Sequence, residues 1–178
     1  MNNEIDLTCY TKKKFSKDDY ADNFTAFESI KKRFSILYLD LHQEDYGIDV
    51  YGYLSESHKK CGKPPIFAIE LEVKHNWKGN NFPFEDVHFL AKKQKHINRE
   101  MMSFWVLCND DCSQAMIMPM QKILNGSLSV VKCKKGIGDD FFYKIPLSEM
   151  YKGINSLERY IIGYAFRNAN CVIKQFLS

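Results

Sequence analysis

The sequence predicts a single α/β (α+β) domain in which a central mixed β-sheet is flanked by helices. The chain has 178 residues, of which 45% are hydrophobic and 26% charged, and this suits one substantial core. Stretches with helical periodicity and stretches with strand periodicity alternate along it. Because no repeat or low-complexity linker divides the chain, we expect one domain over residues 1–178, with a core at about 22–150 and a C-terminal helix at about 154–177.

The first half of the chain reads as one helix followed by three strands. Phe27, Ile30 and Phe34 are spaced as on one face of a helix, which predicts a helix over residues 18–35. Alternating apolar residues separated by turn chemistry then predict strands at 35–42, 46–54 and 66–75.

The second half mixes further strands with helices. We expect a loop at 76–86, a loop leading into a helix at 87–100, and strands at 103–109 and within 114–120, the last ended by Pro119. Weaker strand patterns occupy 123–136 and 140–147. The apolar residues Leu157, Ile161, Tyr164 and Ala165 form a stripe on the final helix.

The strand at 66–75 carries charged residues at strict two-residue intervals. Within "IFAIELEVKHNW", Glu70, Glu72 and Lys74 should share one face of the strand, while the apolar residues between them point to the other face. An ordinary half-exposed strand of an antiparallel sheet also shows this alternation, so the pattern alone leaves both a solvated face and a functional site open.

The preceding strand adds a single carboxylate, Asp49, within an apolar and aromatic run. An aspartate is disfavoured inside a strand unless it has a partner or a function. If the two strands pair so that positions 54 and 65 meet, Asp49 approaches Glu70 or Glu72, depending on register. Carboxylates brought together in this way repel each other unless a cation lies between them, and oxygen ligands suit Mg²⁺ or Mn²⁺.

Asp49, an interval of about twenty residues and then Glu72-Val73-Lys74 resemble the D…(D/E)xK core of the PD-(D/E)xK nuclease superfamily. The resemblance covers about residues 22–110 and is closest to small phage and bacterial members. It implies a restriction-endonuclease-like core. The chain departs from the family in having Ile48 where a proline is usual and in carrying a further glutamate, Glu70.

The resemblance implies a Mg²⁺- or Mn²⁺-dependent nuclease that hydrolyses phosphodiester bonds, in DNA rather than RNA. Asp49 and Glu72 would be the metal ligands, and Lys74 would complete the catalytic set. Glu70 is an additional acidic candidate. Glu28 is another, because the family's N-terminal helix often supplies a carboxylate, although an ordinary surface position explains it equally well.

Substrate contacts form a second group of expectations. Lys92, Lys93 and Lys95 make a compact basic segment that would contact phosphates, or would simply be a solvated helix face. Trp77, Phe82 and Phe84 follow the charged strand in a loop, where they would either stack on an unpaired base or anchor the loop on the core.

Two other classes of protein remain open. A catalytically silent member of the same fold would act as a nucleic-acid-binding or protein-assembly subunit. A protein unrelated to nucleases would carry the charged strand merely as a solvated edge. The apolar final helix would either pack on the sheet or form the seam of a homodimer.

Charge and composition place few limits on partners but favour the cytoplasm. The 25 basic and 22 acidic residues give a formal charge of +3, too small to indicate a partner. We expect no membrane association, because no apolar run reaches the ~18 residues of a membrane span and the start resembles no secretory signal. The six scattered cysteines read as reduced thiols. We therefore expect a cytoplasmic protein of a bacterial cell or phage-infected host.

Overall fold

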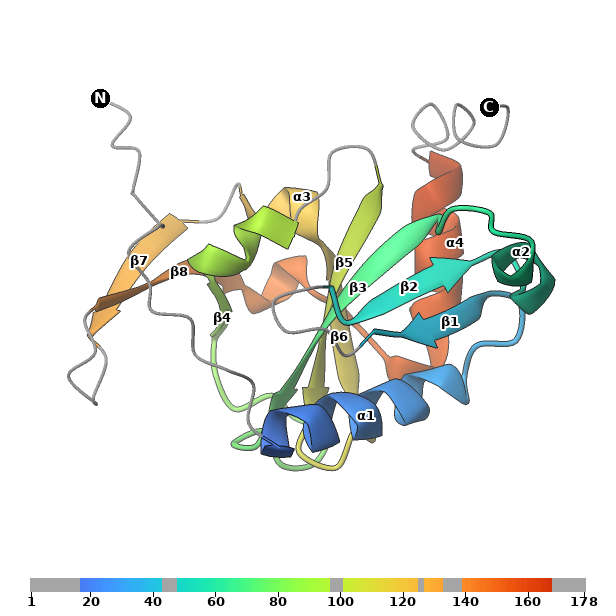
Figure 1. The fold of residues 1–178 in the computed structure, drawn as a ribbon. Coiled ribbons are helices and arrows are strands. Elements are labelled where there is room, and N and C mark those ends of the chain that lie inside the picture. The colour runs from blue at the N-terminus through green and yellow to red at the C-terminus, as the bar shows by residue number, and fades with distance from the viewer. Residues whose placement is uncertain (1–16, 43–47, 97–100, 125–126, 133–138, 168–178) are drawn as a thin grey trace, which may run out of the picture.

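A mixed sheet of six strands forms the centre of the molecule (Figure 1). The structure is a computed structural model that describes residues 17–42, 48–96, 101–124, 127–132 and 139–167. The strand order is β1-β2-β3-β5-β6-β9. Only β3 and β5 run parallel, and the other neighbouring pairs are antiparallel. The strands are β1 (Tyr38–Leu41), β2 (Val50–Tyr53), β3 (Phe67–Lys74), β5 (Met102–Asn109), β6 (Ala115–Pro119) and β9 (Tyr151–Lys152).

The β2–β3 hairpin has the register that the sequence allowed. Val50 pairs with Ile69, and the same register continues to positions 54 and 65 and brings Asp49 opposite Glu70. Gly52 permits close packing here, because a Cβ atom at this position would lie 2.0 Å from Cζ of Phe67. The expected hairpin is therefore confirmed. Its connection contains a short helix, α2 (Glu56–Lys60), where only a turn was expected.

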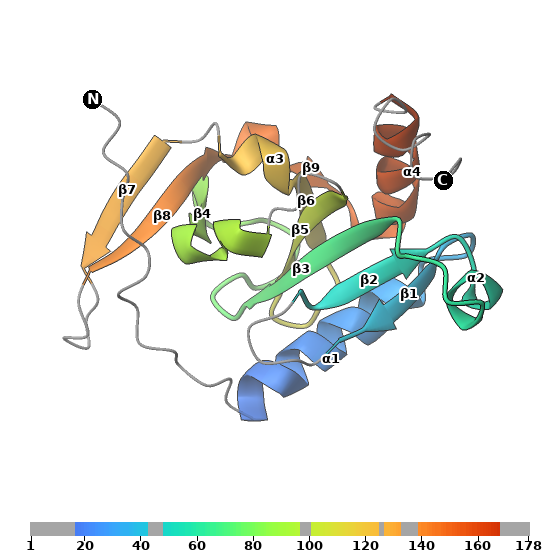
Figure 2. The same ribbon diagram turned by 45° about the horizontal axis from the view of Figure 1, so that its top comes forward.

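A second, three-stranded sheet lies beside the central one, in the order β4-β8-β7 (Figure 2). Its strands are β4 (Asp86–Leu90), β7 (Ser127–Lys132) and β8 (Asp139–Pro146). The prediction of a loop at 87–90 is wrong, because these residues form β4 and pair with β8. The alternation of Val87 and Phe89, both buried, with half-buried neighbours is the strand signal that this expectation overlooked.

Helices cover both faces of the central sheet. The α-helices are α1 (Lys17–Lys31), α2, α3 (Met120–Ile123) and α4 (Leu157–Arg167), and the 3₁₀ helices are η1 (Ala91–His96), η2 (Leu147–Glu149) and η3 (Ile154–Ser156). The basic segment therefore begins as a 3₁₀ helix. The final helix begins near the expected residue, and 168–178 lie outside the described residues.

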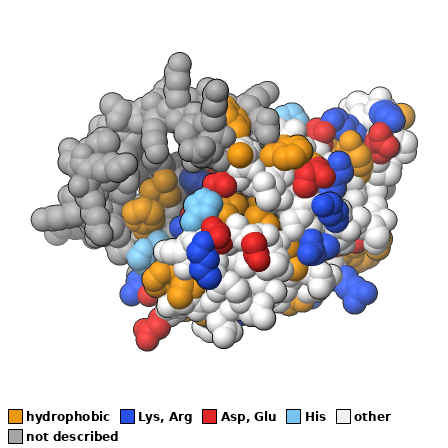
Figure 3. Space-filling view, turned by 90° about the horizontal axis from the view of Figure 1, so that it is seen from below, with side chains coloured by type: hydrophobic (Ala, Val, Ile, Leu, Met, Phe, Trp, Pro, Cys, Tyr) orange, Lys and Arg blue, Asp and Glu red, His pale blue; other side chains and the backbone are white. Residues whose placement is uncertain are grey.

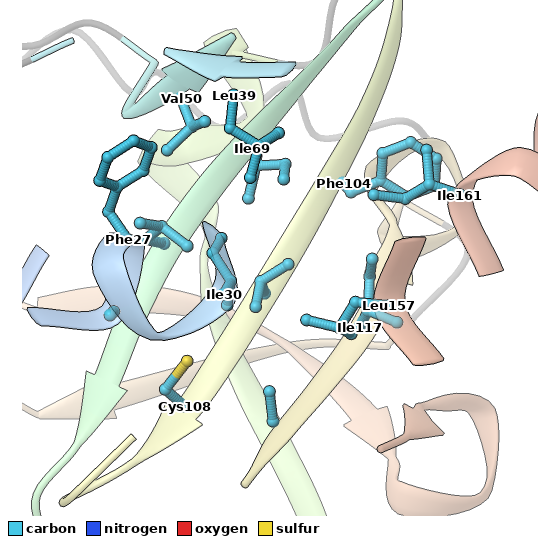
Figure 4. Close-up of a cluster of buried hydrophobic side chains, with 14 of the residues drawn as sticks. Phe27, Ile30, Leu39, Val50, Ile69, Phe104, Cys108, Ile117, Leu157 and Ile161 are labelled. Carbon is cyan, nitrogen blue, oxygen red and sulfur yellow. The ribbon is translucent and has the colours of Figure 1, made fainter. Parts of the chain in front are cut away.

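Two hydrophobic clusters lie on opposite faces of the central sheet. The helix-side cluster joins the sheet to α1 and α4, and it includes Phe27, Ile30, Ile69, Phe104, Leu157 and Ile161 (Figure 4). The small-sheet cluster joins the sheet to β4, β8 and α3, and it includes Trp77, Phe89, Trp105, Met116, Ile123 and Ile145. Strand β5 supplies both clusters, and all eight of its residues are buried.

These elements confirm the mixed α/β class with a central mixed sheet and flanking helices. The apolar stripe of α4 packs on the sheet, since Leu157 and Ile161 are buried and Tyr164 contacts Phe104 edge to face. In the described parts of the chain, each helix is too short or too polar to cross a membrane.

Candidate active site

Asp49 lies at the start of β2, at the junction between the central sheet and α1. Its side chain is 6% exposed. The backbone N–H of Leu71 donates a hydrogen bond to Oδ2 at 2.7 Å, and the amide of Asn23 donates to Oδ1 at 2.8 Å. The carboxylate is therefore held between strand β3 and helix α1.

The environment of Asp49 is unfavourable for a negative charge. Burial raises the pKa of Asp49 to about 8, and the neighbouring negative charge of Glu70 adds to this effect, with a smaller contribution from Glu72. The positive charge of Lys93 and the hydrogen bond from Leu71 oppose the shift without cancelling it. A carboxylate with so high a pKa is typical of a site that functions with a cation or a proton bound.

Glu70 and Lys93 form the buried ion pair of this site. The side chain of Glu70 is 5% exposed, and its Oε1 lies 2.6 Å from Nζ of Lys93, which is 24% exposed. The other oxygen, Oε2, is buried and has no hydrogen-bond partner among the described residues. Burial alone would lower the pKa of Lys93, but the charges of Glu70, Glu72 and Asp49 raise it, so the ammonium stays charged.

Glu72 and Lys74 form a second pair on the same face of β3. Their side chains are 23% and 29% exposed, and Nζ of Lys74 lies 2.5 Å from Oε1 of Glu72. The expected alternation is confirmed: Ile69 and Leu71 enter the helix-side cluster, whereas the charged residues face the other way. Lys74 and Glu72 are accessible to a ligand, whereas Glu70 is enclosed.

The structure joins a polar residue of α1 to the site, and it is not the expected one. Asn23 contacts Asp49, whereas Glu28 lies more than one turn further along the helix, and its side chain forms neither a hydrogen bond nor an ion pair among the described residues. Sequence patterns do not mark Asn23, because its contact with Asp49 links two elements that are distant in sequence.

Of the basic segment, Lys93 is turned toward the carboxylates. The side chains of Lys92 and Lys95 lie outside the described residues. Contact of these lysines with nucleic acid stays a prediction. Of the loop aromatics, Trp77 anchors the loop in the small-sheet cluster at 2% exposure, whereas Phe84 is 48% exposed.

The residues fit a cation held by few protein ligands. Among the described side chains, no group of three or more His, Cys, Asp or Glu residues is arranged to hold a metal ion. Mg²⁺ does not need three protein ligands, because it keeps several water molecules and binds only one or two carboxylates. The raised pKa of Asp49 and the unpaired Oε2 of Glu70 both indicate an excess of negative charge that a cation would relieve.

A second polar cluster lies beside the site at the end of β3. His75 contacts Asp110 through Nδ1 and Asp22 through Nε2, both at 2.8 Å, and Lys78 also pairs with Asp110. These hydrogen bonds, first that of Asp110 and then that of Asp22, raise the pKa of His75. Figure 3 shows acidic, basic and histidine side chains close together on the lower face of the molecule. The cluster connects α1 to the ends of β3 and β5.

Comparison of the chain with protein-family models, with curated proteins and with solved structures finds no match.

Proposed function

We propose that the protein is a metal-dependent nuclease of the PD-(D/E)xK type that hydrolyses phosphodiester bonds in DNA. The observation that carries the proposal is the burial of Asp49 beside the carboxylates of Glu70 and Glu72, which raises its pKa to about 8. Lys74, the basic residue of the proposed motif, contacts one of these carboxylates.

The order of the elements supports a restriction-endonuclease-like core. Helix α1 is followed by β1, by β2 with Asp49 at its start, by β3 with Glu72 and Lys74, and then by the basic segment in η1. This is the order that the superfamily resemblance implies. The chain departs from it in two ways: β4 is inserted before the basic segment, and the described part of that segment is a short 3₁₀ helix.

Asp49 and Glu72 would hold Mg²⁺ or Mn²⁺, with a backbone carbonyl such as that of Val73. When bound, the metal would lower the pKa of a water molecule and neutralise charge on the scissile phosphate. The hydrogen bonds from Leu71 and Asn23 fix the orientation of Asp49, so that its carboxylate would need little rearrangement to bind a cation.

Lys74 would act on the phosphate and on the attacking water. Its ammonium is a compact point charge, and the contact with Glu72 holds it on the accessible face of β3. A positive charge in this position stabilises the negative charge that develops in the transition state. Lys93 is enclosed with Glu70 and would instead balance the charge of the carboxylates.

Cleavage of a labelled panel tests the proposal. The panel would contain linear duplex, single strand, nicked circle and four-way junction DNA, with Mg²⁺, Mn²⁺ or EDTA. We expect metal-dependent cutting that Lys74→Ala lowers by about 10²- to 10³-fold, the usual cost of losing one charge-stabilising group. Asp49→Ala should abolish cutting and weaken Mn²⁺ binding in calorimetry.

The matched control is Lys122→Ala, which removes an exposed lysine of α3. Circular dichroism would show that each variant is folded. Cutting by Lys74→Ala at the wild-type rate would remove this lysine from the mechanism. Absence of both cutting and Mn²⁺ binding in the wild-type protein would instead favour a catalytically silent binding or assembly subunit.

Homodimerisation and a cytoplasmic location remain predictions. Phe166 near the end of α4 is 78% exposed and would be available to a second copy, while much of the stripe before it is used within the chain. Light scattering of the purified protein would measure its oligomeric state.

A further inference from the structure

A pocket opens beside the proposed active site, between the loop after β3 and strands β6 and β9. Its volume is about 300 Å³, at the lower limit of the size of small-molecule sites. Its polar lining residues include Asn80, Asn81, Gln114 and Lys152, and the aromatic ones are Trp77 and Phe82.

The register of the sheet relates this pocket to the active site. Glu72 pairs with Leu107, Leu107 with Met116, and Met116 with Lys152, so these four residues form one row across the sheet. Met116 and Lys152 line the pocket. With strands about 4.8 Å apart, the row places the pocket about 10–15 Å from Glu72, on the same face of the sheet. A strand held at Glu72 would reach the pocket by passing over the residues that cover Leu107 and Met116, which are buried.

The lining suits a nucleobase. Phe82 is partly exposed and offers a ring to a base, while Trp77 behind it contacts it edge to face, with ring centroids 5.2 Å apart. Amides can bind the polar edge of a base because each carries both donors and an acceptor. The Nε2 atom of Gln114 donates to Oδ1 of Asn80 at 3.2 Å, and among the described residues the side-chain carbonyl oxygen of Gln114 has no partner. The amide of Asn81, an exposed residue of the lining, is also available to a ligand.

The charge of the lining suits an anionic ligand. No carboxylate is among the residues that line the pocket, and exposed Lys152 contributes a positive charge.

We propose that this pocket binds one unpaired base of a nucleic-acid strand whose backbone passes Glu72 and Lys74. The inference rests on the proposed nuclease function, which it extends to a substrate with at least one unpaired nucleotide near the cut. In this arrangement Phe82 stacks on the base, the amides of Asn81 and Gln114 contact its polar edge, and Lys152 faces a phosphate.

Binding in EDTA tests the pocket separately from catalysis. Fluorescence anisotropy would measure the affinity of the full chain for a labelled single-stranded DNA and for a series in which one nucleotide at a time is abasic. We expect one abasic position to weaken binding by about tenfold, the usual effect of losing one stacked base. In the double variant Asn81→Ala/Gln114→Ala that position should lose its effect, and Lys152→Ala should weaken binding of the whole series.

Lys63→Ala is the matched control, because it removes an exposed lysine in the β2–β3 connection. A wild-type protein that shows the abasic effect but does not cut DNA with Mg²⁺ or Mn²⁺ would support the pocket and contradict the nuclease. Equal affinity across the abasic series, an abasic effect that persists in the double variant, or absence of single-strand binding would overturn the pocket. Such results would leave metal-dependent cutting to be judged by its own assay.

Discussion

Three carboxylates and two ammonium groups lie around β3 at the proposed site, and their burial decides how they behave. Glu70 is enclosed and paired, whereas Glu72 and Lys74 are partly exposed. Asp49 has hydrogen bonds but no salt bridge among the described residues, and burial, together with the negative charge of Glu70, raises its pKa to about 8. The metal-free fold therefore keeps Asp49 largely protonated at neutral pH, and ionising it destabilises the fold.

This charge gives Asp49→Asn a predictable effect on stability in EDTA. A raised pKa means that the folded state keeps its proton to higher pH than the unfolded state, whose aspartate titrates near 3.8. The free energy of unfolding of the wild type should therefore fall as pH rises from about 4 to about 8. Asparagine does not ionise, so the variant should not show this fall. We expect the variant to be more stable than the wild type by more than about 1 kcal/mol at pH 8, with a smaller difference at pH 5.

Urea unfolding at the two pH values would measure the difference. Asp111→Asn is the control, because the Asp111 carboxylate is exposed and hydrogen bonds from Ser113 lower its pKa. A variant less stable than the wild type at pH 8 would contradict the unfavourable environment that we assign to Asp49.

Lys93→Met should destabilise the fold, in contrast to Asp49→Asn. It leaves Glu70 buried without its cation and next to Asp49, and breaking a largely buried ion pair in this way costs about 2–4 kcal/mol. The double variant Lys93→Met/Glu70→Gln should recover most of the loss, because it removes both charges. Thermal unfolding of the two variants would measure this coupling. Equal losses in the two would show that the methionine itself, rather than the unpaired charge, is responsible.

At the scale of the elements, Glu158 fastens α4 to the connection between α1 and β1. Its side chain accepts hydrogen bonds from the backbone N–H groups of Ser35, Ile36 and Leu37, at 2.7–3.1 Å. Burial alone would raise the pKa of Glu158, but these hydrogen bonds outweigh it and lower the pKa. The C-terminal helix is thus tied through one carboxylate to the segment that leads into the sheet.

Glu158→Gln should destabilise the fold by about 1–3 kcal/mol, because an amide has one acceptor oxygen and no charge. A lowered folded pKa contributes stability that is present above the unfolded pKa, near 4.5, and is lost as pH falls through the folded pKa. The cost of the substitution should therefore shrink below about pH 4. Chemical denaturation at pH 7 and pH 3.5 would show this, with exposed Glu149→Gln as the control.

Local sequence patterns predicted the secondary-structure elements well, but they predicted the contacts between these elements less well. The hairpin of β2 and β3 followed from alternation and turn chemistry, and its register brought Asp49 opposite Glu70 as one of two alternatives. Strand β4 was missed because the alternation of Val87 and Phe89 spans only five residues and a basic segment follows directly. The contact of Asn23 with Asp49 depends on how α1 crosses the sheet, which no local pattern encodes.

At the scale of the molecule, the two hydrophobic clusters share one strand. Residues of β5 alternate between them, so that Phe104 enters the helix-side cluster and Trp105 the small-sheet cluster. Because close-packed cores transmit strain, neither face of the sheet can open without loosening β5. We therefore expect the described domain to unfold as one cooperative unit.

Ile30→Val tests this cooperativity. The substitution removes a buried methylene from the helix-side cluster and should cost about 0.5–1.5 kcal/mol. Both tryptophans of the chain, Trp77 and Trp105, lie in the small-sheet cluster, so their fluorescence reports on the opposite face of the sheet. If β5 couples the clusters, the urea midpoints from tryptophan fluorescence and from far-ultraviolet circular dichroism should fall together. Ile36→Val, at a side chain that is 66% exposed, should move neither midpoint. A fluorescence midpoint that stays at the wild-type value in Ile30→Val would mean that the two faces unfold independently, and that the carboxylates on β3 are held by the small-sheet side alone.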